Sequence, residues 1–290
     1  MTHATILIGP LTRDFIRWPG KGLGRAPESW VQWSQPGGAV WHAGLALVLT
    51  SDQPDAGVFA IGTAGAWAGR NGIPGLVATG VGWRGVESAT ETAFVNRYDA
   101  DRRRQTLLSA GEPLTREALA RALAGLAPAA AVVSPLMPGD TLAGAGAMLS
   151  AAGAFVAADA QGFLRVPGSQ GQIETRRVDL REALVGVRAV KFSEREFRVY
   201  AGLGRGSEWR VAAVEAAREL RAEVIVSLGA GGALVALPGG ASPGDVVDVA
   251  GPSLRGEADT TGAGDILIAM YARGRSQGLG AAAALDRAVG

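Results

Sequence analysis

The most informative part of the sequence is Asp259-Thr260-Thr261-Gly262-Ala263-Gly264-Asp265, which is followed directly by the apolar segment 266–274 (ILIAMYARG). The second segment has a helical composition, so a glycine turn opens a helix here. Such a turn presents unpaired backbone N–H groups and the positive end of the helix dipole to one point. That point suits a phosphate group on which negative charge develops. We therefore expect Gly262, Ala263 and Gly264 to form an anion-binding turn.

Asp265 is the carboxylate inside this turn. It could accept a proton from an attacking hydroxyl while the backbone amides hold the transferred phosphoryl group. The other interpretation is that Asp265 caps the helix, because aspartate is a common capping residue. From these seven residues alone, both interpretations stay open.

An alternation of helical and strand-like segments precedes this turn. Helical patterns at 115–126, 140–153 and 207–220 alternate with short apolar runs at 129–134, 154–159, 188–192 and 223–229. That order predicts βαβ units on a parallel sheet, with 207–220 as a crossover helix capped by Ser207. Residues 4–9 are expected to form a buried first strand. Segments 28–38 and 92–108 alternate polar and apolar residues and predict half-exposed antiparallel strands.

The composition excludes several classes of protein. The 290-residue chain is 48% hydrophobic, carries a formal net charge of +1 without a basic block, and contains no cysteine and two histidines. These values exclude disulfides and disfavour nucleic-acid binding, anionic membrane binding and histidine-rich zinc chemistry. Without an apolar run of about 18 residues or a secretory leader, we expect a cytoplasmic protein without a membrane span.

Two other nucleotide-binding folds fit the sequence poorly. A P-loop is excluded because neither lysine, Lys21 or Lys191, follows the required glycine loop. Residues 227–237 (SLGAGGALVAL) hold close glycines after a strand, as in a Rossmann dehydrogenase. However, the residues after these glycines predict another strand instead of the helix that binds a dinucleotide.

The motif at 259–265 resembles the C-terminal signature D-T-x-G-A-G-D of the ribokinase-like sugar kinases, also called the phosphofructokinase-B family. The resemblance implies one domain over 1–290 with a three-layer α/β fold: a mainly parallel central sheet, flanking helices and a small β lid from insertions at about 15–38 and 92–108. It also implies Asp265 as the catalytic base, ATP as the donor, Mg²⁺, and a monovalent cation such as K⁺. Lid strands in such relatives often pair between subunits, which predicts a homodimer through the lid.

On the acceptor side, Gly9 and Asp14 resemble the family's first strand end and its sugar-binding aspartate. Gly37-Gly38 and the following helix resemble the signature G-G-x-x-x-N, with His42 in place of the asparagine. Histidine can still make one hydrogen bond, but it is bulkier and titrates near neutral pH. His42 is therefore either a substrate contact or a structural residue.

The segment 159–165 (DAQGFLR) resembles the D-x-Q-G-x-x-R segment of a branch that includes inositol kinases. Asp159 and Arg165 are thus candidate substrate ligands, or they form a buried structural pair. This segment and 92–108 make inositol the first candidate acceptor, with a nucleoside kinase as an alternative. The substitutions at His42 and Ser193 also leave open a catalytically weak ligand-binding or regulatory protein.

On the donor side, residues 191–196 resemble the K-x-N-x-x-E segment, with Lys191 and Glu196 matched and Ser193 in place of asparagine. Glu196 is expected to organise Mg²⁺ and its waters; otherwise it lies on a solvated helix face. A T-x-G-x-x-G segment for the nucleotide phosphates is matched at Ser227, Gly229 and Gly232, and Thr260 of the glycine turn is also expected to bind the donor.

Two features at the ends of the sequence add expectations. The sequence ends at Gly290 within an expected helix, where relatives usually continue and help to line the adenine site, so nucleotide preference stays open. Near the beginning, tryptophans could give the lid an aromatic surface for a substrate or a second subunit, although ordinary packing explains them nearly as well. These residues are Trp18, Trp30, Trp33 and Trp41.

Overall fold

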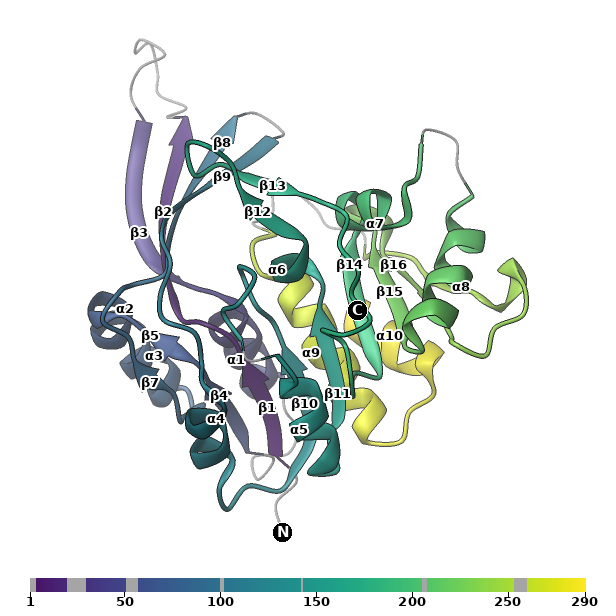
Figure 1. Ribbon diagram of the computed structural model, residues 1–290, viewed down its shortest axis with the longest axis horizontal. Coiled ribbons are helices and arrows are strands. Elements are labelled where there is room, and N and C mark those ends of the chain that lie inside the picture. Colours follow the sequence, from purple (N-terminus) through teal and green to yellow (C-terminus); the bar gives the residue numbers. More distant parts are fainter. Residues whose placement is uncertain are drawn as a thin grey trace.

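The strand predicted at the beginning of the chain, β1 (Ala4–Ile8), lies inside a large sheet in the computed structural model (Figure 1). The structure describes residues 4–19, 30–50, 57–99, 102–141, 143–204, 208–252 and 260–290. Within these residues, nine strands form the order β17-β16-β15-β14-β11-β10-β1-β4-β6. The other strands are β4 (Val58–Ile61), β6 (Gly82–Trp83), β10 (Pro128–Val133), β11 (Phe155–Asp159), β14 (Ala189–Ser193), β15 (Glu223–Ser227), β16 (Ala233–Ala236) and β17 (Val247–Val249).

The sheet is mainly parallel, as predicted. All neighbouring pairs from β15 to β6 are parallel, whereas β16 and β17 pair in antiparallel fashion at one edge. Strand β16 directly follows the glycine segment at 229–232, so the strand predicted there is confirmed. The helix that a dinucleotide-binding fold would need does not follow these glycines. Because parallel strands end at the same edge, the residues that follow them gather along one side of the sheet.

Helices cover both faces of the sheet and give three layers. Alternate side chains of β1 enter different cores: Ile6 and Ile8 pack in one, and Leu7 packs in the other. The first core takes in α4 (Arg116–Leu123), α5 (Ala145–Ala151), α7 (Glu194–Ala201) and α8 (Trp209–Leu220). The second takes in α1 (Ala39–Leu49), α2 (Ala66–Asn71), α3 (Ile73–Ala78), α9 (Ala263–Ser276) and α10 (Ala281–Val289). The predicted three-layer fold is confirmed.

One predicted helix is shorter than expected. The pattern at 140–153 yields α5 only from Ala145 onward, so its predicted beginning is wrong. Asp140 instead accepts hydrogen bonds from the N–H groups of Leu136 and Met137, at 2.9 and 2.7 Å. These bonds close a turn before the helix, which then begins after Gly144. Helix α8 begins at Trp209, and its predicted cap, Ser207, lies outside the described residues.

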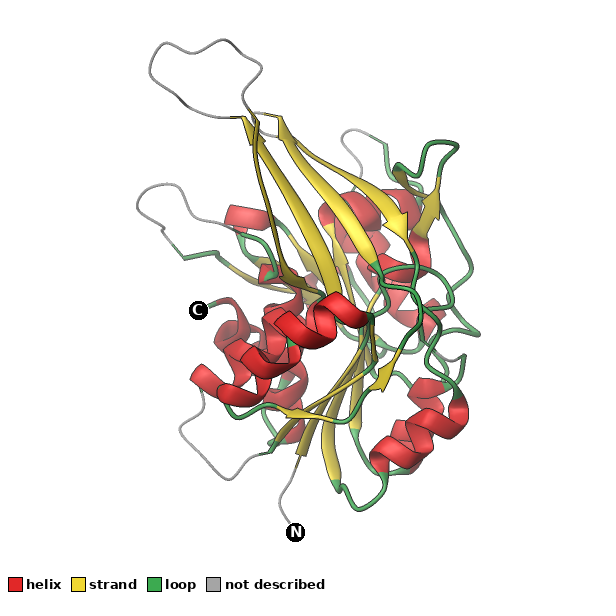
Figure 2. Cartoon of the chain, turned by 90° about the vertical axis from the view of Figure 1, so that its left-hand side faces the viewer, coloured by secondary structure: helices red, strands yellow, loops and turns green. Residues whose placement is uncertain are grey.

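The two strand-like insertions combine into one small sheet that rises above the body (Figure 2). Its order is β3-β2-β8-β9, and β8 and β9 pair in antiparallel fashion, as predicted for the segment 92–108. These strands are β2 (Thr12–Pro19), β3 (Trp30–Gly37), β8 (Ala93–Asp99) and β9 (Arg102–Ser109). This sheet is called the lid below. The division of the chain into a single domain with an inserted lid stays a prediction.

Short elements complete the chain around the two sheets. A helical turn, α6 (Gln161–Leu164), leads into the hairpin of β12 (Arg165–Pro167) and β13 (Ile173–Thr175). Strands β5 (Thr63–Ala64) and β7 (Val86–Glu87) pair beside α2, and two 3-10 turns are η1 (Gly229–Gly231) and η2 (Pro243–Asp245). In the residues that the structure describes, no helix has the length and apolar character needed to cross a membrane.

The predicted aromatic surface of the lid is only partly present. Trp33 on β3 is 43% exposed, and its indole N–H donates to Gln35 Oε1 at 3.1 Å. Trp41 lies on α1, not on the lid, and packs against the core beside Gly75. The side chains of Trp18 and Trp30 lie outside the described part of the chain.

Candidate functional site

The glycine turn opens α9 as predicted. Gly262 is the N-cap residue, with φ 81°, and Asp265 is the third residue of the helix. The cap position therefore belongs to Gly262, and the interpretation of Asp265 as the cap residue is wrong. The turn is held by a hydrogen bond from Ala263 N to Thr260 O at 3.1 Å, and Ile266 N donates to Gly262 O at 2.9 Å. Asp259 lies outside the described residues.

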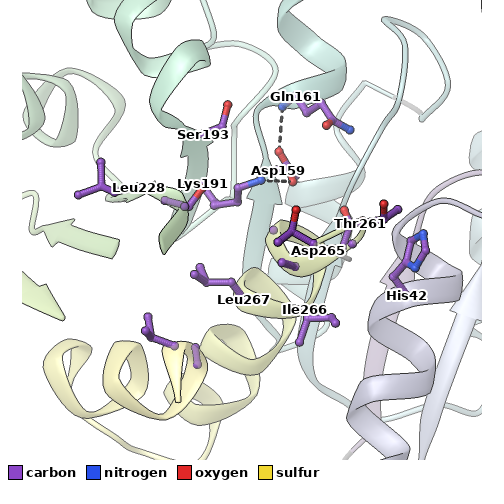
Figure 3. A pocket seen from close by; sticks show the side chains of 18 of the residues that line it. His42, Asp159, Gln161, Lys191, Ser193, Leu228, Thr261, Asp265, Ile266 and Leu267 are labelled. Carbon is purple, nitrogen blue, oxygen red and sulfur yellow. Dashed lines mark hydrogen bonds and ion pairs between the residues drawn. The ribbon is translucent and has the colours of Figure 1, made fainter. Parts of the chain in front are cut away.

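Side chains from distant parts of the chain contact this turn on both sides (Figure 3). A Cβ atom added to Gly262 would lie 2.4 Å from His42 Cγ, and one added to Gly264 would lie 2.7 Å from Lys191 Nζ. Gly262 also has a left-handed φ that residues with a side chain rarely adopt. The imidazole and the ammonium thus lie directly against the backbone that is expected to bind an anion.

Lys191 forms a buried ion pair within this group. Its Nζ lies 2.7 Å from Asp159 Oδ2, and the side chains are 6% and 1% exposed. Burial lowers the pKa of Lys191, but the carboxylates of Asp159, Glu196 and Asp265 outweigh it, so the pKa is raised and the ammonium stays charged. Asp159 Oδ1 also accepts a hydrogen bond from Gln161 N at 2.9 Å.

Asp159 therefore pairs with Lys191 and not with Arg165, the partner that the sequence suggested. Arg165 is buried; its Nη1 donates to Leu136 O at 3.2 Å, and its guanidinium carbon lies 5.9 Å from the centre of the Phe94 ring. Asp159 and Lys191 are register partners on the adjacent strands β11 and β14, which explains their pairing.

Ser193 and Glu196 form a capping box at the beginning of α7. Glu196 Oε2 accepts from Ser193 N at 2.7 Å, and Ser193 Oγ accepts from Glu196 N at 3.4 Å. Glu196 is therefore not on a solvated helix face; its carboxylate is fixed at the edge of the site. The described residues contain no cluster of three or more acidic or histidine ligands for a metal. Glu196 lines the cavity and supplies a carboxylate, the kind of oxygen ligand that Mg²⁺ takes.

These groups line one cavity of about 830 Å³. It contains all of the predicted site residues except Gly37, which lies behind it: a Cβ atom on Gly37 would lie 2.6 Å from Asp14 Oδ2. Asp14 is 6% exposed, and its Oδ1 accepts from Thr12 Oγ1 at 2.8 Å. The predicted residues in the lining are Asp14, Gly38, His42, Asp159, Arg165, Lys191, Ser193, Glu196, Ser227, Gly229, Gly232, Thr260, Gly262, Ala263, Gly264 and Asp265.

The cavity extends to both sides of Asp265: in Figure 3, Leu228 lies on one side of this carboxylate and His42 lies on the other. One end lies beneath the lid, where Phe94 and Gln105 join Asp14, and it suits an acceptor. The other end contains the loop after β15, where Ser227 Oγ donates to Phe192 O at 3.4 Å, and the end of α10. The second end suits a phosphate donor, because the Ser227 hydroxyl and the glycine-rich loop 229–232 offer hydrogen-bonding groups there.

Several lining residues were not predicted from the sequence. Gln161 belongs to the quoted segment 159–165, so the motif itself was a signal for it. Phe94 and Gln105 lie on lid strands, and only their places in an alternating pattern could have indicated an inward direction. Arg287 and its neighbours at the end of α10 carry no local signal, since their place depends on how that helix packs.

The fold and the glycine turn define an α/β phosphotransferase of the ribokinase type. The sequence profile of the "pfkB family carbohydrate kinase" matches residues 79–290, and the chain belongs to this family. It is therefore a carbohydrate kinase, as predicted from the sequence. No curated protein sequence matches the chain significantly.

Similar solved structures cover nearly the whole chain. A pyrophosphate-dependent kinase in the ribokinase family, complexed with a pyrophosphate analogue and myo-inositol, is 22% identical with a TM-score of 0.76, covering 98% of this chain and 92% of its own. Ribokinase from Cryptococcus neoformans var. grubii serotype A with ADP is 19% identical (TM-score 0.70; 100% and 92%). Phosphofructokinase-2 from Escherichia coli is 18% identical (TM-score 0.66; 100% and 91%). These likenesses confirm the fold.

Proposed function

We propose that this kinase transfers the terminal phosphoryl group of ATP to a hydroxyl of a cyclic polyol of the inositol type or of a monosaccharide, with Asp265 as the general base. One observation carries the proposal: Asp265 lines the cavity between Leu228 and His42, in the first turn of the helix that Gly262 opens and close to the buried ammonium of Lys191. A proton acceptor and a site for a migrating anion are thus adjacent.

In the proposed reaction, the acceptor hydroxyl gives its proton to the carboxylate of Asp265 as its oxygen forms a bond to phosphorus. The bond between that phosphorus and the ADP oxygen breaks. The turn amides and Lys191 stabilise the negative charge on the transferred group. Mg²⁺, when bound near Glu196, would neutralise charge on the donor phosphates. The monovalent cation expected from the family resemblance stays a prediction.

The acceptor end of the cavity supports a polyol. Asp14, Gln105 and Gln161 can each hydrogen-bond hydroxyl groups, while Phe94 and Leu136 offer apolar surface to the face of a ring. The D-x-Q-G-x-x-R segment favours inositol among such rings. The solved structure with bound myo-inositol has the same fold, which agrees with this choice.

The lid also supports the proposed homodimer. Its edge strand β3 exposes Trp33 (43%); at the other edge β9 exposes Leu108 (55%), although the backbone of β9 also pairs with residues 171–172 at Thr106 and Leu107. Exposed edge strands with apolar side chains favour pairing with another chain. Size-exclusion chromatography with light scattering would measure the oligomeric state; a monomer at all concentrations would contradict this part of the proposal.

Turnover with a panel of acceptors tests the function. We expect wild-type protein with ATP and Mg²⁺ to phosphorylate myo-inositol or a monosaccharide, measured as acceptor-dependent ADP release and as product phosphate by NMR. Asp265→Asn should lower kcat by about 10² to 10⁴ because it removes the base. Asp286→Asn, which changes an exposed carboxylate outside the cavity, is the matched control and should behave as wild type.

Each other outcome points to a different conclusion. Equal turnover by Asp265→Asn and wild type would eliminate Asp265 as the base. Turnover restricted to nucleosides would favour the nucleoside kinase. Saturable binding of a polyol without turnover, with either ATP or pyrophosphate as donor, would favour a ligand-binding protein.

A further inference from the structure

The lid reaches the catalytic turn through one side chain. The hydroxyl of Tyr98, near the end of β8, lies 3.1 Å from Thr261 Oγ1, and either hydroxyl can donate the hydrogen bond. The two residues are 163 positions apart in the sequence. Thr261 occupies the variable position of the D-T-x-G-A-G-D motif and directly precedes Gly262, so the contact adjoins the expected anion site.

Tyr98 continues a row of side chains on the inner face of the lid. Phe94, Asn96 and Tyr98 alternate along β8 and therefore share one face of the strand. Phe94 lines the cavity, and the buried Asn96 accepts a hydrogen bond through Oδ1 from Gln105 Nε2 at 2.9 Å. Gln105, directly opposite on β9, also lines the cavity. One row thus extends from the acceptor end of the cavity to the catalytic turn.

We propose that Tyr98 is a positioning residue that couples the lid to the catalytic turn. A change in the position of β8 over an acceptor would be transmitted through the Tyr98–Thr261 bond to the residue before Gly262. The amides of the turn and Asp265 would then reach their working orientation only when the lid is in place. Tyr98 itself is not among the residues that line the cavity, so it acts through Thr261 and does not touch the reacting groups.

Phosphoryl transfer would benefit from a contact between the lid and the glycine turn. An amide site that binds a migrating phosphoryl group must be held close to its working geometry, and small displacements lower the rate strongly. A turn with two glycines has more conformational freedom than one with side chains. The lid contact restrains that turn in the state in which the acceptor is covered, which also favours transfer to the acceptor over transfer to water.

Hydrogen exchange tests the coupling without any acceptor. The informative amides are those of Ala263 and Ile266, which donate to Thr260 O and Gly262 O. Tyr98→Phe removes only the hydroxyl, and we expect these amides to exchange about two- to tenfold faster, the range set by one net hydrogen bond. Tyr200→Phe is the matched control, because the Tyr200 hydroxyl is buried without a hydrogen-bond partner in the described residues. The control should exchange at the wild-type rate at this turn.

Kinetics then distinguish coupling from general loosening. With an acceptor that the wild type phosphorylates, Tyr98→Phe and Thr261→Val should each lower kcat by about two- to tenfold with little change in KM for ATP. The double variant should lose no more than the more severe single variant, because both changes remove the same bond. A double variant whose losses multiply would overturn the proposal.

Hydrogen exchange tests the coupling, and turnover tests the proposed function, so the two can be judged separately. Unchanged exchange at the turn in Tyr98→Phe overturns the coupling, even if the enzyme is active. Equal acceleration in Tyr98→Phe and Tyr200→Phe also overturns it, since that result reports loosening unrelated to the bond. A wild-type protein without turnover on any acceptor contradicts the proposed function alone, and the exchange measurement still decides the coupling.

Discussion

Lys191→Met should destabilise the folded protein strongly, because it removes one partner of a buried ion pair. Methionine keeps most of the length of the lysine side chain but carries no charge. The remaining carboxylate, Asp159, is only 1% exposed and would keep its hydrogen bond from Gln161 N while losing the ammonium at 2.7 Å. Removing one partner of such a pair costs about 3 to 5 kcal/mol of the free energy of unfolding.

An exposed ion pair of the same protein serves as the control for the loss of unfolding free energy. Arg176 and Glu174 lie 3.2 Å apart with side chains 62% and 54% exposed, so Arg176→Met should cost at most about 1 kcal/mol. Urea unfolding followed by tryptophan fluorescence and by far-UV circular dichroism gives both values. Combining Lys191→Met with Asp159→Asn should recover most of the loss, because asparagine can still accept from Gln161 N and carries no charge to bury.

Two results of the unfolding measurements would contradict the predicted effect of Lys191→Met. If Lys191→Met and Arg176→Met lower the unfolding free energy equally, the ammonium of Lys191 contributes no more than a surface charge. If the double variant is no more stable than Lys191→Met alone, the loss does not come from an uncompensated carboxylate.

Two further predictions concern the same site. Since Asp159, Glu196 and Asp265 raise the pKa of Lys191 despite its burial, its contribution to stability is complete below its unfolded pKa and is lost only as pH rises through the folded-state value. The difference in unfolding free energy between wild type and Lys191→Met should therefore be constant from neutral pH to about pH 9, and a decline over that range would contradict the raised pKa. Gly262→Ala should lower kcat by about 10²-fold, because its Cβ would displace His42 or the turn. Gly125→Ala, with φ 73° and open space around its Cβ, carries the same backbone strain and should keep wild-type kcat; equal losses in the two variants would contradict the contact.

The parallel strands could be predicted because their signal is local. Runs such as 155–158 and 224–226 are apolar throughout, since both faces of the sheet are covered by helices, and each is preceded by a helical pattern. The glycine turn could also be predicted, because the glycines, the helix and Asp265 are contiguous in the sequence. Local chemistry also explains the error at Asp140, where a polar side chain closed a turn by bonding backbone amides ahead of the expected helix.

The pairing of side chains across the site could not be predicted in this way. Asp159 faces Lys191 because β11 and β14 are neighbours with these residues in register, and no pattern within either strand specifies that register. The contact of His42 with Gly262 depends in the same way on how α1 packs against α9. A family signature can place His42 near the acceptor, but it does not indicate that the imidazole would lie against the catalytic turn.

The arrangement of these contacts explains how a glycine-rich turn can serve as a fixed anion site. Glycine frees the backbone amides for a ligand and admits close neighbours, but each glycine also adds conformational entropy that opposes a single geometry. Three separate elements compensate: α1 places His42 against Gly262, β14 places Lys191 against Gly264, and the lid bonds Thr261 through Tyr98. The first two come from α1 and β14, elements packed in the hydrophobic cores on the two faces of the central sheet. The third comes from the sheet that covers the acceptor, so it is the one contact whose strength can depend on what is bound beneath the lid.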